Sequence, residues 1–115
     1  MMEIQELEKE LIEKNKWLFL KLTEQKDLVR NAAQTEHDYR IALAQEILRQ
    51  RVDGTPATIM ADICRGKPEI AKFKLQRDIA KGMADACKEG IRAIQQAMSG
   101  LQSLISTRKE EMKLL

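Results

Sequence analysis

The feature that most constrains this chain is the placement of its helix-breaking residues. Both prolines and two of the five glycines fall within one short stretch, Val52 to Pro68, which reads V-D-G-T-P-A-T-I-M-A-D-I-C-R-G-K-P. No glycine or proline comes before Gly54. Because these two residue types are the least favourable in a helix interior, their placement predicts two long helices joined by a short corner.

The first helix is expected from residue 2 to about residue 51. Its apolar residues recur near the helical period and predict one buried stripe. The predicted stripe consists of Ile4, Leu7, Leu11, Leu18, Leu22, Val29, Ala32, Leu43 and Ile47. Poor helix formers gather between Asn31 and Asp38. The sequence therefore leaves open whether the helix continues through residues 31–38.

The corner has turn chemistry at both of its ends. Gly54 is placed to end the first helix in the left-handed conformation. Thr55 is expected as the N-cap, and Pro56 as the first residue, of a short helix over about 56–64. Its residues Ile59, Met60 and Ile63 are expected to cover the end of the core. A second long helix is then expected from residue 68 to about residue 112, with Glu69 in its first turn.

The second long helix has a seven-residue repeat that occupies three rows. One row contains Phe73, Ala80, Cys87, Ile94 and Leu101, and a second contains Met83, Gly90 and Ala97. A third row, which begins at Ile70, is interrupted only by Arg77. So broad an apolar face usually contacts more than one neighbouring helix. We therefore expect an oligomer interface made of Phe73, Ala80, Met83, Cys87, Gly90, Ile94, Ala97 and Leu101.

These observations predict an all-α fold. Residues 1–115 are expected to form a single helical domain, an antiparallel hairpin of two long helices with a short helix at the corner. Each helix of roughly 45 residues would be about 68 Å long. Because a hairpin of that length leaves apolar surface uncovered, we expect a coiled-coil-like homo-oligomeric bundle, a dimer or higher.

Residue types that could support catalysis are few. His37 lies between two acids but has no second group to orient it, and Cys64 and Cys87 fit small core positions better than nucleophile positions. No spacing of Cys, His or carboxylate residues predicts a metal site, and no phosphate-binding loop or dinucleotide fingerprint is present. We interpret the chain as non-enzymatic, with no catalytic, cofactor-binding or metal site.

Positive charge gathers in the middle of the chain. Residues 40–81 carry nine basic and five acidic residues, whereas residues 1–39 carry six basic and nine acidic ones. In a hairpin, the basic residues nearest the corner would lie together, and such a cluster can bind phosphates or an acidic protein surface. The predicted contact residues are Arg49, Arg51, Arg65, Lys67, Lys72 and Lys74. A solvated face with local ion pairs is an equally weighted alternative.

The location of the protein is expected to be cytoplasmic. The first residues are acidic, with no basic and apolar regions of a secretory signal, and no apolar run approaches membrane-spanning length. Two cysteines without a partner pattern suit a reducing compartment. We expect no membrane partner.

The segment from about residue 38 to residue 80 resembles small helical proteins encoded in prophages of Gram-positive bacteria. The resemblance lies in the runs D-Y-R-I-A-L-A-Q-E-I-L-R-Q-R, T-P-A-T-I-M-A-D-I-C-R-G and K-P-E-I-A-K-F-K-L-Q-R-D-I-A. It implies a small cytoplasmic phage protein and transfers no functional residue. We expect a non-catalytic accessory protein that binds and modulates a macromolecular partner. The role expected for it is inhibition of a host defence system. The alternatives are a nucleic-acid-binding protein of phage replication or recombination, an oligomer that sequesters a nucleotide, and a structural part of the virion.

Overall fold

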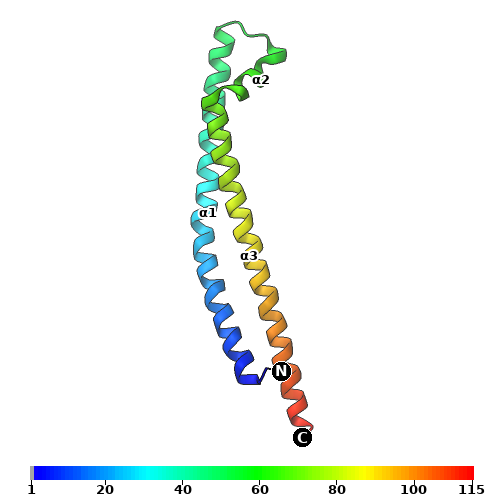
Figure 1. The fold of residues 1–115 in the computed structure, drawn as a ribbon. Helices are drawn as coiled ribbons and strands as arrows, with labels where there is room; N and C mark the ends of the chain where they lie inside the picture. The colour runs from blue at the N-terminus through cyan, green and yellow to red at the C-terminus, as the bar shows by residue number, and fades with distance from the viewer. Residues whose placement is uncertain (1) are drawn as a thin grey trace. The chain divides into compact units, whose positions relative to one another are not determined.

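A computed structural model describes residues 2–115, and these residues form three α-helices. Helix α1 spans Ile4–Val52, α2 spans Ala57–Gly66 and α3 spans Pro68–Lys113 (Figure 1). The part of the chain described contains no β-strand. The all-α prediction is confirmed, and each predicted helix end lies within two residues of the observed one.

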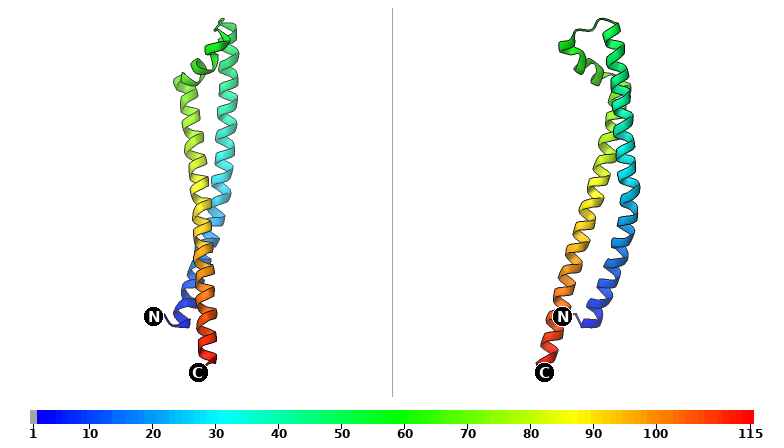
Figure 2. Two further views of the ribbon diagram at one scale, coloured as in Figure 1. Left: turned by 90° about the vertical axis from the view of Figure 1, so that its right-hand side faces the viewer. Right: turned by 180° about the vertical axis from the view of Figure 1, so that it is seen from behind.

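Segments of the long helices α1 and α3 pack against each other and the chain turns at α2, so the predicted hairpin with a corner helix is confirmed (Figures 1 and 2). The packing contacts divide the chain into two compact units. Unit 1 contains the chain up to Lys26 together with Ala86–Leu115, and unit 2 contains Asp27–Asp85. Each unit thus combines one segment of α1 with one segment of α3, and unit 2 also contains α2. The single helical domain expected for residues 1–115 therefore stays a prediction, because the structure divides into two units.

Helix α1 is continuous through residues 31–38, which settles the point that the sequence left open. The Thr35 hydroxyl donates to the carbonyl oxygens of Asn31 and Ala32, at 2.9 and 3.0 Å. The Gln34 amide donates to Asp38 at 2.9 Å. Residues that usually compete with the helix backbone here make their hydrogen bonds within the helix, so their low propensity does not interrupt it.

In unit 1, the contact between α1 and α3 follows positions spaced by three and four residues. The buried side chains are Leu7 on α1 and Cys87, Ile91 and Ile105 on α3. The Cys87 thiol also donates to the carbonyl oxygen of Lys21 at 3.5 Å. This spacing is that of an antiparallel coiled-coil seam. We call these contact positions, in both units, the inner seam.

In unit 2, the inner seam contains Tyr39, Ile70 and Ala80, all of which are buried. The predicted stripe is wrong at two residues, because Leu22 of unit 1 is 42% exposed and Val29 of unit 2 is 52% exposed. The seam instead passes through Leu28 and Tyr39. The apolar residues alone did not predict this path of the inner seam, since the seven-residue spacing also places polar residues at seam positions.

The corner confirms one predicted helix end and corrects another. Gly54 has a φ angle of 80°, the left-handed conformation expected of a glycine that follows a helix. Helix α2 begins one residue later than predicted, with Pro56 rather than Thr55 at the N-cap and with no side-chain capping bond. Thr55 instead donates from its hydroxyl to the Gln50 side-chain oxygen at 2.6 Å. Thr55 thereby fixes the corner to α1 and not to α2.

Helix α2 covers the core differently from the prediction. Its fully buried residue is Cys64, with no exposed surface, and Met60 is half-buried. Ile59 and Ile63 are 46% and 36% exposed, so the expectation that they cover the end of the core is wrong. The short helix therefore buries a small thiol and leaves its two isoleucines at the surface.

Candidate functional site at the corner of unit 2

All six predicted contact bases lie in unit 2. Arg49 and Arg51 occupy the last turn of α1, Arg65 the last turn of α2, and Lys67 the junction before α3. Lys72 and Lys74 follow within α3. The six bases therefore come from α1, from α2, from the junction before α3 and from α3.

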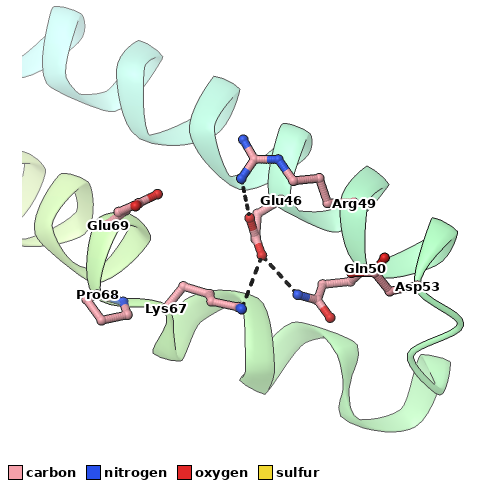
Figure 3. A pocket seen from close by; sticks show the side chains of 7 residues that line it. All are labelled: Glu46, Arg49, Gln50, Asp53, Lys67, Pro68 and Glu69. Atoms are coloured by element: carbon pink, nitrogen blue, oxygen red, sulfur yellow. Dashed lines mark hydrogen bonds and ion pairs between the residues drawn. The ribbon is translucent and has the colours of Figure 1, made fainter.

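A pocket at the corner brings only two of these bases together. It is lined by Glu46, Arg49, Gln50, Asp53, Lys67, Pro68 and Glu69 (Figure 3). Three of the lining residues are acidic and two are basic. The remaining four predicted bases do not line it. A pocket with this balance of charge favours neither a phosphate nor another anion.

Glu46 lies at the centre of the pocket, and no pattern in the sequence singled it out. Its carboxylate accepts hydrogen bonds from Arg49 at 3.0 Å and from the Gln50 amide at 2.9 Å, and Lys67 lies 3.9 Å away (Figure 3). Glu46 is 6% exposed and Gln50 is 8% exposed. Thr55 completes the chain of hydrogen bonds by donating to Gln50. This network is a structural anchor, because it links α1 to the turn and to the start of α3.

The other four predicted bases are free to meet a partner. Arg51, Arg65, Lys72 and Lys74 are exposed, and within residues 2–115 none of them has an ion pair or a side-chain hydrogen bond. Arg49 and Lys67 differ, because both form ion pairs with Glu46. The structure thus separates the predicted set into two anchoring bases and four available ones.

A second charged cluster lies along the inner seam of unit 2. Arg77 stacks over the Tyr39 ring at 4.5 Å and lies 3.4 Å from Glu36, and Arg40 donates to Glu36 at 2.7 Å. The hydrogen bond from Arg40, with added attraction from Arg77, lowers the pKa of Glu36 below its ordinary value of 4.5. The hydrogen bond to Asp78 raises the pKa of Arg77. The signal in the sequence was the single interruption of the third apolar row by Arg77, since a charge on a seam requires a partner.

Exposed apolar side chains accompany the free bases. Ile41, Leu48 and Val52 follow one another on α1 at intervals of seven and four residues, and they are 46%, 60% and 87% exposed. This spacing keeps them on one side of the helix. Arg51 flanks that side, because it lies three residues after Leu48. We call Ile41, Leu48, Val52 and Arg51 the corner surface.

The residues predicted for an oligomer interface do not share one environment. Ala80 and Cys87 are buried within the single chain, so they belong to the inner seam and are not available to a second chain. Met83 is 51% exposed and Phe73 is 36% exposed. Gly90, Ile94, Ala97 and Leu101 are half-buried. Sequence periodicity mixed two adjacent faces of α3 because each repeats every seven residues.

Other groups with reactive side chains are dispersed. Among residues 2–115, no group of three or more His, Cys, Asp or Glu side chains is placed to hold a metal ion. Cys64 and Cys87 are free thiols and are buried. None of the three helices, as described over residues 2–115, has an apolar stretch that could span a bilayer. Comparisons with models of protein families, with curated proteins and with solved structures find no match to this chain.

Proposed function

We propose that this chain is a non-catalytic accessory protein that binds a protein partner through the corner surface of unit 2. The observation that carries the proposal is the row of exposed apolar side chains at Ile41, Leu48 and Val52, with Arg51 beside it. Large apolar residues at helical spacing are the anchors of helix-to-groove and helix-to-helix recognition. An arginine at the edge of such a row adds charge-assisted hydrogen bonds to the contact.

The chemistry of the corner surface favours an amphipathic partner with acidic residues. Leu48 and Val52 would enter an apolar groove, while Arg51 and Arg65 would pair with carboxylates at its edge. A partner held in this way is modulated by occupation of its surface, so no reacting group is needed. The resemblance to prophage proteins supports a host protein as partner, and a component of a defence system is the partner that we propose.

Nucleic acid is the second candidate, and the four free bases support it. Acidic residues lie among them, however, because Asp53, Asp62 and Glu69 come from the same turns of chain. Each acid reduces the number of phosphates that the surface can neutralise. A nucleotide bound in the corner pocket would have to displace Glu46 from its ion pairs with Arg49 and Lys67. We therefore rank the protein partner first.

The test uses the full chain with a photo-reactive amino acid in place of Leu48, irradiated inside a Gram-positive host. The expected result is a covalent adduct with one host protein, whose binding to the purified chain is then measured. Leu48→Glu should weaken that binding at least about tenfold, because it removes a central anchor. Ile12→Glu is the matched control: Ile12 is also 60% exposed but lies in unit 1, so binding should be unchanged.

Two results would reject the protein-partner proposal. One is an adduct with nucleic acid alone, accompanied by DNA binding that weakens steeply with salt. The other is equal binding by Leu48→Glu and the parent chain. In the second case, the corner surface has no part in the contact.

A further inference from the structure

Helix α3 has a line of uncharged residues with heptad spacing beside the inner seam. From Ile79 to Leu104, at alternating intervals of four and three residues, eight successive positions are uncharged. The row begins with Ile79 and Met83, ends with Gly100 and Leu104, and contains only Ala and Gly between them. Alternation of four and three residues is the spacing of a helix-to-helix contact. We call this row the outer face of α3.

The single chain leaves most of the outer face uncovered, and only Gly90 and Ala97 of its eight residues are half-buried. Ile79, Met83 and Leu104 are 54%, 51% and 49% exposed. Apart from the adjoining backbone of its own helix, a Cβ atom added at Gly90 or at Gly100 would meet no atom within 4 Å. A glycine in a helix interior destabilises the helix by about 1 kcal/mol relative to alanine. Contacts within one chain therefore do not explain why glycine occupies these two positions.

We infer that the outer face of α3 binds the same face of a second copy of this chain, with the two helices antiparallel. The twofold axis passes between Ile91 and Arg92. In this register Ile79 faces Leu104 of the second copy, and Met83 faces Gly100 of the second copy. A bulky side chain thus meets a glycine, and the Ala and Gly positions between them allow the two backbones to approach closely.

Charge at the two ends of the row specifies this orientation. The same alternation of four and three residues reaches Lys72 at one end and Glu111 at the other. Antiparallel pairing sets Lys72 against Glu111 of the second copy, whereas parallel pairing would oppose like charges. Within residues 2–115 neither side chain has an ion pair in the single chain. The outer face is therefore complementary to itself in size and in charge, which favours a second copy over an unrelated partner.

The pairing is distinct from the proposed function, since it uses α3 and leaves the corner surface on α1 free. Its row spans about 38 Å at 1.5 Å per residue. Two chains joined in this way carry two copies of the corner surface. Loss of the pairing would leave the binding of a partner by each chain in place, so the two proposals fail separately.

The test is sedimentation equilibrium of the full chain, with helicity measured by circular dichroism. The parent chain is expected to be a dimer. Gly100→Met should raise the dimer dissociation constant at least about tenfold without loss of helicity, because methionine favours a helix over glycine. The matched control Ser99→Met introduces the same side chain on another side of α3 and should leave the dimer intact. The double variant Met83→Gly with Gly100→Met exchanges the two opposed side chains and should restore pairing.

A charge exchange tests the orientation separately. Lys72→Glu should weaken the dimer, because it opposes Glu111 of the second copy, and adding Glu111→Lys should restore it. A monomeric parent chain overturns the proposal. So does a dimer that Gly100→Met leaves unchanged, or one that neither double variant restores, because the contact would then lie elsewhere or run in the other direction.

Discussion

Replacement of Glu46 by alanine tests whether the polar network at the corner stabilises the fold. The change removes the acceptor of the hydrogen bonds from Arg49 and Gln50 and the charge near Lys67. The side chains of Arg49 and Lys67 are 65% and 46% exposed, so both can return to water at little cost. Gln50 cannot, because it is 8% exposed, and its amide hydrogens would stay buried without an acceptor.

The expected loss of stability follows from that buried amide. An unsatisfied buried polar group costs about 1–3 kcal/mol, so Glu46→Ala should lower the free energy of unfolding by about 2 kcal/mol. Glu46→Gln keeps an oxygen that can accept the bond from Gln50, and its effect should stay within about 1 kcal/mol. Urea unfolding followed by circular dichroism at 222 nm, at one fixed protein concentration, measures both changes.

Glu89→Ala is the control for this series. Glu89 accepts a hydrogen bond from Arg92 at 3.0 Å, the same distance and the same sequence spacing as the Arg49–Glu46 pair, but its side chain is 67% exposed. Its removal should change the free energy of unfolding by less than about 0.5 kcal/mol. Equal losses in Glu46→Ala and Glu89→Ala would refute the reasoning, because burial would then make no difference.

The remaining predictions concern the turn, α3, the charged cluster and the core. Gly54→Ala should destabilise the protein by about 1–2 kcal/mol, since Gly54 has a φ of 80°. Gly82→Ala should stabilise it by up to about 1 kcal/mol, because no atom beyond the adjoining backbone of α3 lies within 4 Å of the added methyl. Thermal and urea unfolding measure both changes. The pKa of Glu36 is lowered in the folded chain, so its contribution to stability is complete above its ordinary value of 4.5 and is lost as the pH falls below it. Arg40→Ala should weaken that acid dependence, as urea unfolding between pH 3 and pH 6 would show; an unchanged profile would contradict it. Leu7→Ala should cost about 2–3 kcal/mol, because Leu7 is 2% exposed, and a loss below about 1 kcal/mol would show that the seam of unit 1 adds little.

The sequence was sufficient for the helices and for much of the corner. Helix breakers are local signals, so the confinement of both prolines and of Gly54 to one stretch fixed the number of helices and their ends to within two residues. The left-handed conformation of Gly54 followed from the same local chemistry. The capping of α2 did not, because Thr55 had two possible acceptors and only the fold placed Gln50 within 2.6 Å of its hydroxyl.

The candidate site was predicted only in part. The charge count placed the six bases in the middle of the chain, and all six do lie in unit 2. The charge count could not separate the bases that pair with Glu46 from the unpaired ones. Arg49 and Arg51 look alike in a sequence, yet only Arg49 pairs with a buried carboxylate. The exposure of Leu48 and Val52 could not be predicted from the sequence either. Periodicity finds apolar residues but does not show which of them a neighbouring helix covers.

By itself, the sequence determined that this chain is helical, where its helices end and that its basic residues gather near the corner. These properties depend on backbone preferences and on composition, which each residue carries with it. Only the tertiary structure decided which side of each helix is buried. It made Glu46 an anchor, assigned Ala80 and Cys87 to the inner seam, and left Ile79 and Met83 at the surface. The physical reason is that burial depends on the approach of two segments distant in sequence, and neither segment specifies that approach alone.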